Sequence, residues 1–111
     1  MNITILGAGA WGSALAINLS GRHHVTLWAC HAAQIDAMCA TRYNQRYLPE
    51  IPLPQSLNLT ADLRVAFTSA ELILVAVPIA ALRSTLQQIA TMSMPIPVIW
   101  ACKGFEAGTT Q

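Results

Sequence analysis

The feature that most constrains this chain is a glycine-rich motif that follows its first apolar run. Residues 3–6 read Ile-Thr-Ile-Leu, and residues 7–12 read Gly-Ala-Gly-Ala-Trp-Gly. An apolar pattern with helical spacing then runs over residues 14–19. A buried strand, a tight glycine turn and a helix are therefore expected in this order.

Each glycine of the motif has its own physical task in such a unit. Gly7 allows a sharp reversal of the chain, Gly9 leaves room for a pyrophosphate at the backbone, and Gly12 lets the helix approach the strand closely. The helix N-terminus, with its free N–H groups and positive dipole end, would face the phosphates. The motif thus predicts a dinucleotide site; a strand-to-helix turn that binds nothing is the alternative.

The length fits one domain, and the high fraction of hydrophobic residues suggests that a neighbouring part of a protein covers some of its surface. The chain has 111 residues, of which 54% are hydrophobic and 10% charged, whereas an ordinary globular chain is about 25% charged. Its apolar runs, such as residues 72–77, are far shorter than the ~20 residues of a membrane span. The formal net charge of +1 arises from scattered residues, so no nucleic-acid or anionic lipid partner is expected.

The cysteines and the first residues bear on the compartment. Cys30, Cys39 and Cys102 are odd in number and lack CxxC spacing, so neither a disulfide framework nor a metal site is expected. No basic segment precedes an apolar core at the N-terminus, because Gly7 and Gly9 interrupt the apolar run. A reduced, cytoplasmic protein is expected.

The rest of the chain alternates between strand and helix patterns. Further strands are predicted at residues 24–28, 57–60, 72–77 and 98–101. A helix is predicted at residues 31–40, with Ile35, Met38 and Cys39 on its apolar face. A short helix is predicted after Thr60, which would cap it, and another helix is predicted at residues 79–90. Gly21 is expected to end the first helix in the left-handed conformation. Residues 41–56, with three prolines, read as a loop. The rhythm predicts an α/β fold of the Rossmann type, a doubly wound parallel sheet with helices on both faces.

The residues after the second predicted strand bear on which dinucleotide is bound. An acidic side chain there binds the ribose 2′-hydroxyl, and a basic one binds a 2′-phosphate. This chain has no carboxylate between Gly7 and Asp36 and reads Ala-Cys-His at residues 29–31. His31 can donate to a 2′-phosphate, which favours NADPH or the use of both NAD and NADP. An equal alternative is that His31 merely opens the next helix.

Two further side chains are candidates for ligand contact. Lys103, the only lysine of the chain, follows the last predicted strand and precedes Gly104. Chemistry in open α/β sheets lies outside the carboxyl ends of strands, so Lys103 is placed to bind a substrate phosphate, polarise a carbonyl or reach the cofactor amide; a solvated surface lysine is the alternative. Trp11 is a candidate for ligand contact or for core packing.

Several segments spread over the whole chain occur together in one enzyme family. They are residues 7–16 (GAGAWGSALA), 25–28 (VTLW), 47–49 (YLP), 52–54 (PLP), 76–78 (AVP) and 100–106 (WACKGFE). In this order they resemble the bacterial NAD(P)-dependent glycerol-3-phosphate dehydrogenases. The glycine motif is generic, but Tyr-Leu-Pro together with Lys-Gly-x-Glu is more specific.

The resemblance implies hydride transfer between NAD(P)H and dihydroxyacetone phosphate or sn-glycerol 3-phosphate. It also implies a place for each matching residue: Ala10 and Trp11 at the cofactor pyrophosphate, His31 near the adenosine ribose, Tyr47 close to the cofactor, Pro78 beneath it, and Lys103 against both cofactor and substrate. A homodimer is expected for the full-length enzyme.

The chain departs from the family pattern at two positions and in length. Ala10 stands where serine is common in the family. An arginine that the family often has after the second strand is absent, and its absence argues against a strict NADP preference. In the family, the nucleotide domain continues with further strands, and a helical domain supplies the catalytic lysine. We therefore expect residues 1–111 to be a cofactor-binding domain, incomplete at the C-terminal end of its sheet, with no catalytic residue and no turnover alone. A non-catalytic dinucleotide-binding module and a fragment of a related hydroxyacid dehydrogenase are the alternatives.

Overall fold

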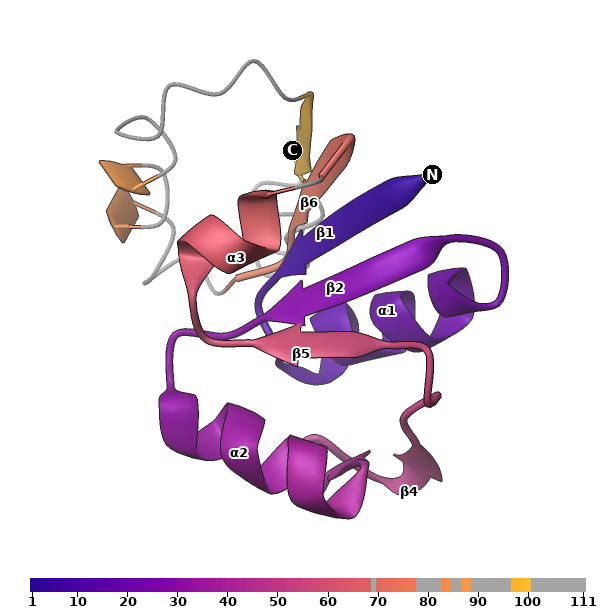
Figure 1. The fold of residues 1–111 in the computed structure, drawn as a ribbon. Helices are drawn as coiled ribbons and strands as arrows, with labels where there is room; N and C mark the ends of the chain where they lie inside the picture. Colours follow the sequence, from indigo (N-terminus) through magenta and orange to yellow (C-terminus); the bar gives the residue numbers. More distant parts are fainter. Residues whose placement is uncertain (69, 78–82, 85–86, 89–96, 101–111) are drawn as a thin grey trace, which may run out of the picture.

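The core of the molecule is a five-stranded parallel sheet (Figure 1). The computed structural model describes residues 1–68, 70–77, 83–84, 87–88 and 97–100. The strands of the sheet are β1 (Asn2–Leu6), β2 (His24–Trp28), β5 (Asn58–Thr60), β6 (Leu72–Val75) and β7 (Val98–Trp100), in the order β5-β2-β1-β6-β7. Each pair of neighbouring strands is parallel. The predicted parallel sheet is confirmed.

Helices cover both faces of this sheet, as predicted. Helix α1 (Ala10–Ser20) and helix α2 (Ala32–Thr41) pack on one face, and helix α3 (Leu63–Phe67) packs on the other (Figure 1). Successive side chains of a strand point to opposite faces. Ile5 therefore joins the buried cluster that contains α1 and α2, whereas Leu6 joins the cluster that contains α3. Both strand residues are fully buried, which explains the continuous apolar pattern of these strands.

The strand order reverses direction at β1, which creates a crevice at one edge of the sheet. The chain moves outward from β1 through β2 to β5, and then crosses back to place β6 on the other side of β1. Leu6 pairs with Trp28 on one side and with Val75 on the other, so the three strands end level with one another. Ligands of open α/β sheets bind at such a switch point, outside the carboxyl ends of the strands.

Residues 41–56, predicted as a loop, contain an antiparallel hairpin. Strand β3 (Tyr43–Asn44) pairs with strand β4 (Leu48–Pro52). Arg42 enters it in the left-handed conformation, with φ of 59°, and its guanidinium donates to the carbonyls of Pro54 and Leu57. The loop prediction is wrong because contacts of single residues with distant parts of the chain hold this segment, and such contacts leave no periodic pattern.

Two predicted details of the helix ends are also corrected. Gly21 follows α1 with φ of −73°, in the right-handed region, because the N–H groups of Arg22 and His23 both donate to the Leu19 carbonyl in a continued turn. Asp62, and not Thr60, caps α3: its carboxylate accepts from the Arg64 N–H at 2.9 Å. The Thr60 hydroxyl instead accepts from the Asp62 N–H at 3.0 Å, which orients the cap.

The later elements agree with prediction as far as the structure describes them. Strand β6 ends two residues before the predicted end at residue 77. Of the helix predicted at residues 79–90, residues 83–84 and 87–88 are described and have helical backbone. Arg83 and Gln87 are exposed, as expected for side chains off the apolar face. Pro78, the other residues of this helix and residues 101–111, which include Cys102 and Lys103, lie outside the described residues.

Candidate functional site

The glycine motif forms a tight connection between β1 and α1 at the crevice. Gly7 has φ of +114°, a conformation that side chains disfavour, and a Cβ there would lie 2.6 Å from the Ala76 carbonyl oxygen. A Cβ on Gly12 would lie 1.8 Å from the Gly7 carbonyl oxygen, so only glycine lets α1 approach the strand end. A Cβ on Gly9 would meet no atom within 4 Å. The chain reversal predicted at Gly7 and the close approach predicted at Gly12 are confirmed, and Gly9 faces open space.

The N-terminus of α1 carries no cap from a side chain. Gly9 is the N-cap residue, no side chain accepts from the first turn, and this turn contains no acidic residue. The first bond of the helix is from the Ser13 N–H to the Gly9 carbonyl, at 3.0 Å. The preceding N–H groups have no partner within the helix, and the helix dipole adds a partial positive charge there. This end of α1 is suited to bind an anion.

A cavity of about 300 Å³ lies beside the glycine connection. Residues from several parts of the chain line it: the strand-to-helix connection, the end of β2, the hairpin, and residues beyond β6. The lining residues are Gly7, Ala8, Gly9, Trp28, Ala29, Cys30, His31, Gln34, Tyr47, Val77, Ser84 and Gln88. The fold therefore brings segments as distant as Gly7 and Gln88 to one space at the carboxyl edge of the sheet.

The structure brings four of the predicted site residues together at this cavity. Gly7, Gly9, His31 and Tyr47 line it, and Gly12 lets α1 approach the Gly7 carbonyl and Ala76 closely. Ala10 and Trp11 begin α1 directly after Gly9, and both are exposed. Trp11 is 42% exposed, so the alternative of a core tryptophan is wrong. Pro78 and Lys103 remain predictions, because they lie outside the described residues.

A buried amide network, which sequence reasoning missed, supports the glycine connection. The Asn44 side chain is 1% exposed, and its Nδ2 donates to the Ala8 carbonyl and to the Ser13 hydroxyl, both at 2.8 Å. Gln34 Nε2 donates to the same Ala8 carbonyl at 3.0 Å. Strand β3 and helix α2 thus position the loop that precedes α1. No signal in the sequence marks Asn44, since a polar residue in a segment without periodicity usually lies in a solvated loop.

The residues present fit a nucleotide diphosphate. The open space at Gly9 and the free N–H groups of α1 suit its phosphates. Trp28, which also lines the cavity, is 5% exposed, as expected for a strand residue in the core. Its Nε1 is a buried donor with no partner among the described residues.

Other classes of site find no support in the part of the chain that the structure describes. There is no group of three or more His, Cys, Asp or Glu side chains able to hold a metal ion. Cys30 and Cys39 are both free and exposed, so Cys39 does not belong to the apolar face of α2 as predicted. No described helix has the length and apolar character needed to cross a membrane.

Comparison with known proteins identifies the family. Residues 2–111 match the family described as NAD-dependent glycerol-3-phosphate dehydrogenase N-terminus. The chain belongs to this family. The resemblance carried by the Tyr-Leu-Pro and Lys-Gly-x-Glu segments is thereby confirmed, and the alternative of a hydroxyacid dehydrogenase is set aside.

Individual members agree with this assignment. The chain is 56% identical over 111 residues to a glycerol-3-phosphate dehydrogenase [NAD(P)+] of Nitrosomonas eutropha, covering 100% of the chain and 34% of that protein. It is 53% identical to the protein of the same name from Nitrosomonas europaea, with the same coverage. The crystal structure of glycerol-3-phosphate dehydrogenase from Coxiella burnetii superposes with a TM-score of 0.86 at 34% identity, covering 92% of the chain and 32% of that structure. The chain thus spans about a third of the length of its relatives.

Proposed function

We propose that this chain is the cofactor-binding N-terminal part of an NAD(P)-dependent glycerol-3-phosphate dehydrogenase. The whole enzyme would transfer a hydride between NAD(P)H and dihydroxyacetone phosphate or sn-glycerol 3-phosphate, in keeping with the names of the relatives. One observation carries the proposal. The glycine connection that leads into the uncapped N-terminus of α1 lines a cavity that extends to the end of β2 and to the hairpin, as an extended dinucleotide requires.

The residues have distinct roles in this proposal. The backbone from Gly7 to Gly12, including the N–H groups of Ala10 and Trp11, binds the pyrophosphate of the cofactor. His31, just past β2, lies at the adenosine ribose, and Tyr47 covers the cofactor from the hairpin; both line the cavity. When bound, the cofactor supplies or accepts the hydride, while these residues orient it.

Further roles rest on the resemblance of the last segments to the family. Pro78 would pass beneath the cofactor, and Lys103 would contact both cofactor and substrate. Small phosphorylated molecules are the proposed substrates, cytoplasm the proposed location, and a homodimer the proposed state of the full-length enzyme. We expect the 111-residue chain to bind NADH without oxidising it when dihydroxyacetone phosphate is added. Hydride transfer needs the carbonyl held against the nicotinamide in a water-poor cleft, and the cavity beside a single sheet edge provides one wall of such a cleft.

A substitution at Gly9 tests the proposal. Gly9→Ala meets no neighbouring atom and suits the extended backbone of Gly9, with φ of −78°, so the fold should be unaffected. Its methyl group would occupy the space of the phosphates, and the affinity for NADH and for ADP-ribose, measured by fluorescence titration and calorimetry, should fall about tenfold or more.

Gly21→Ala is the matched control, because a Cβ on Gly21 also meets no atom within 4 Å and its φ is −73°. This variant should bind both ligands like the unsubstituted chain. Equal affinity of the Gly9→Ala and Gly21→Ala variants would contradict the proposed site. Tighter binding of NADH than of ADP-ribose would favour a dehydrogenase domain over a module that binds the adenosine half alone.

A further inference from the structure

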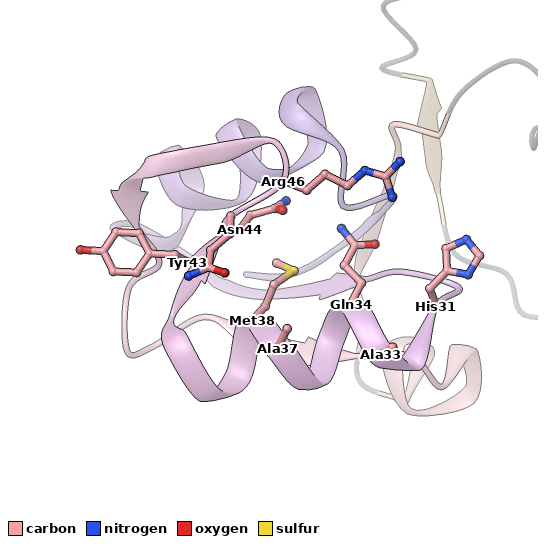
Figure 2. A pocket seen from close by; sticks show the side chains of 9 residues that line it. His31, Ala33, Gln34, Ala37, Met38, Tyr43, Asn44 and Arg46 are labelled. Atoms are coloured by element: carbon pink, nitrogen blue, oxygen red, sulfur yellow. The ribbon is translucent and has the colours of Figure 1, made fainter.

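A second cavity shares two of its lining residues with the first. Its volume is about 540 Å³, and it lies between α2 and the β3–β4 hairpin (Figure 2). His31 and Gln34 line both cavities. A ligand that occupies the first cavity at the end of β2 can therefore extend a substituent past these two side chains into the second.

The second cavity is lined by cationic and neutral groups. Arg46, from the turn between β3 and β4, reaches over Gln34 toward the end of α2 where His31 lies (Figure 2). None of the described residues that line this cavity is a carboxylate. Arg46 forms no ion pair within the described part of the chain; its guanidinium carbon lies 5.4 Å from the centre of the Tyr47 ring. The cavity thus offers a planar cation that is not neutralised by the protein.

The position of this cation is related to that of the first cavity. Arg46 lines the second cavity and its neighbour Tyr47 lines the first. The hairpin turn therefore borders both cavities. In folds of this type the residues just past β2 lie at the 2′ position of the adenosine ribose. Here those residues are Cys30 and His31, and neither is a carboxylate that would bind a free 2′-hydroxyl and repel a phosphate.

We propose that Arg46, together with His31, binds the phosphate monoester on the ribose 2′ position of a phosphorylated dinucleotide. No cation of fixed charge stands directly after β2, and Arg46, which follows His31 by 15 residues, supplies one from the hairpin. A guanidinium donates through a rigid fork that matches phosphate geometry, and such charge-assisted bonds are stronger than neutral ones. This inference rests on the proposed cofactor function and assigns to the hairpin the selection of NADPH over NADH.

Titrations of the 111-residue chain with NADPH and NADH test the assignment. The chain should bind NADPH more tightly than NADH. Arg46→Gln should weaken NADPH binding about tenfold or more and leave NADH affinity within about twofold. Arg46→Lys keeps the charge but loses the fork, so its affinity for NADPH should lie in between. Arg22→Gln, an equal loss of charge at an exposed residue outside both cavities, is the matched control and should change neither affinity.

Two small probes separate the outcomes further. 2′-AMP should compete with NADPH, and its affinity should depend on Arg46, whereas the affinity of 5′-AMP should not. If both dinucleotides bind and the Arg46→Gln and Arg22→Gln variants have the same NADPH to NADH ratio, the inference is wrong while the cofactor site stands. An equal loss of both dinucleotides in Arg46→Gln also contradicts selection by this residue. If the unsubstituted chain binds neither dinucleotide, the proposed function itself fails, and the inference fails with it.

Discussion

The glycine connection and the β3–β4 hairpin border the same cavity, yet they are specified in different ways. The connection depends on the backbone at three positions that are close in sequence: one needs positive φ and another tolerates no Cβ. The hairpin depends on single contacts that join residues far apart. Asn44 binds Ala8 and Ser13, which are 36 and 31 positions away. The requirements of the glycine connection are local, so they appear as a motif in the sequence. The buried amide of Asn44 is a single residue, and no motif marks it.

The largest expected effect comes from the glycine connection itself. Gly12→Ala would bring a methyl group against the Gly7 carbonyl oxygen, where the undisturbed Cβ position is 1.8 Å away. Relief requires α1 to move away from β1, so the free energy of unfolding should fall by about 3 kcal/mol or more. Urea denaturation followed by circular dichroism measures the change, with Gly21→Ala as control. A loss below about 1 kcal/mol would mean that α1 is not held against the strand end in this way.

The hairpin should show a smaller but still distinct effect. Asn44→Ala removes the donor shared by the Ala8 carbonyl and the Ser13 hydroxyl in a buried place, which should cost about 2 kcal/mol of unfolding free energy. It should also weaken NADH binding, because the loop before α1 loses its support. Asn58→Ala, which removes an exposed contact with His24, should alter neither property. A stability loss without any change in NADH affinity would reduce the role of Asn44 to that of the fold alone.

The smallest effect is expected at α2. Gln34→Ala removes one of the two donors to the Ala8 carbonyl, which retains its bond from Asn44, so the cost should be about 1 kcal/mol. Gln55→Ala, at an exposed position, serves as control in the same denaturation experiment. If Gln34→Ala proves as costly as Asn44→Ala, support of the loop would come equally from α2 and the hairpin, and the contrast between the two regions would need revision.

Most of the fold follows from local patterns. The alternation of strands and helices, the parallel sheet and the glycine turn all appear in the structure, because continuous apolar runs and helical spacing reflect burial on fixed faces. Two of the errors concern which of two neighbouring residues takes a given place in a helix. Thr60 has the side chain of a helix cap, but Asp62 is the residue placed at the start of α3. Cys39 has the spacing of a buried residue, but it lies at the exposed side of α2.

The candidate site divides along the same line. The places of Gly7, Gly9, Gly12 and His31 follow from the sequence, since each place depends on the element to which the residue belongs. Arg46, Gln34 and Asn44 are not, because their importance arises only when α2 and the hairpin pack beside the start of α1.

The amino-acid sequence by itself determined that a strand, a glycine turn and a helix open this chain, and that the turn leaves open space at Gly9. Those properties depend on backbone freedom and on the absence of side-chain atoms, which are written into each residue. Only the tertiary structure decided that Arg46, distant from β2 in the chain, lines the same cavity as His31, and that the buried Asn44 holds the turn. These are properties of distance in space, and the packing of the hairpin against α2 and α1 sets that distance.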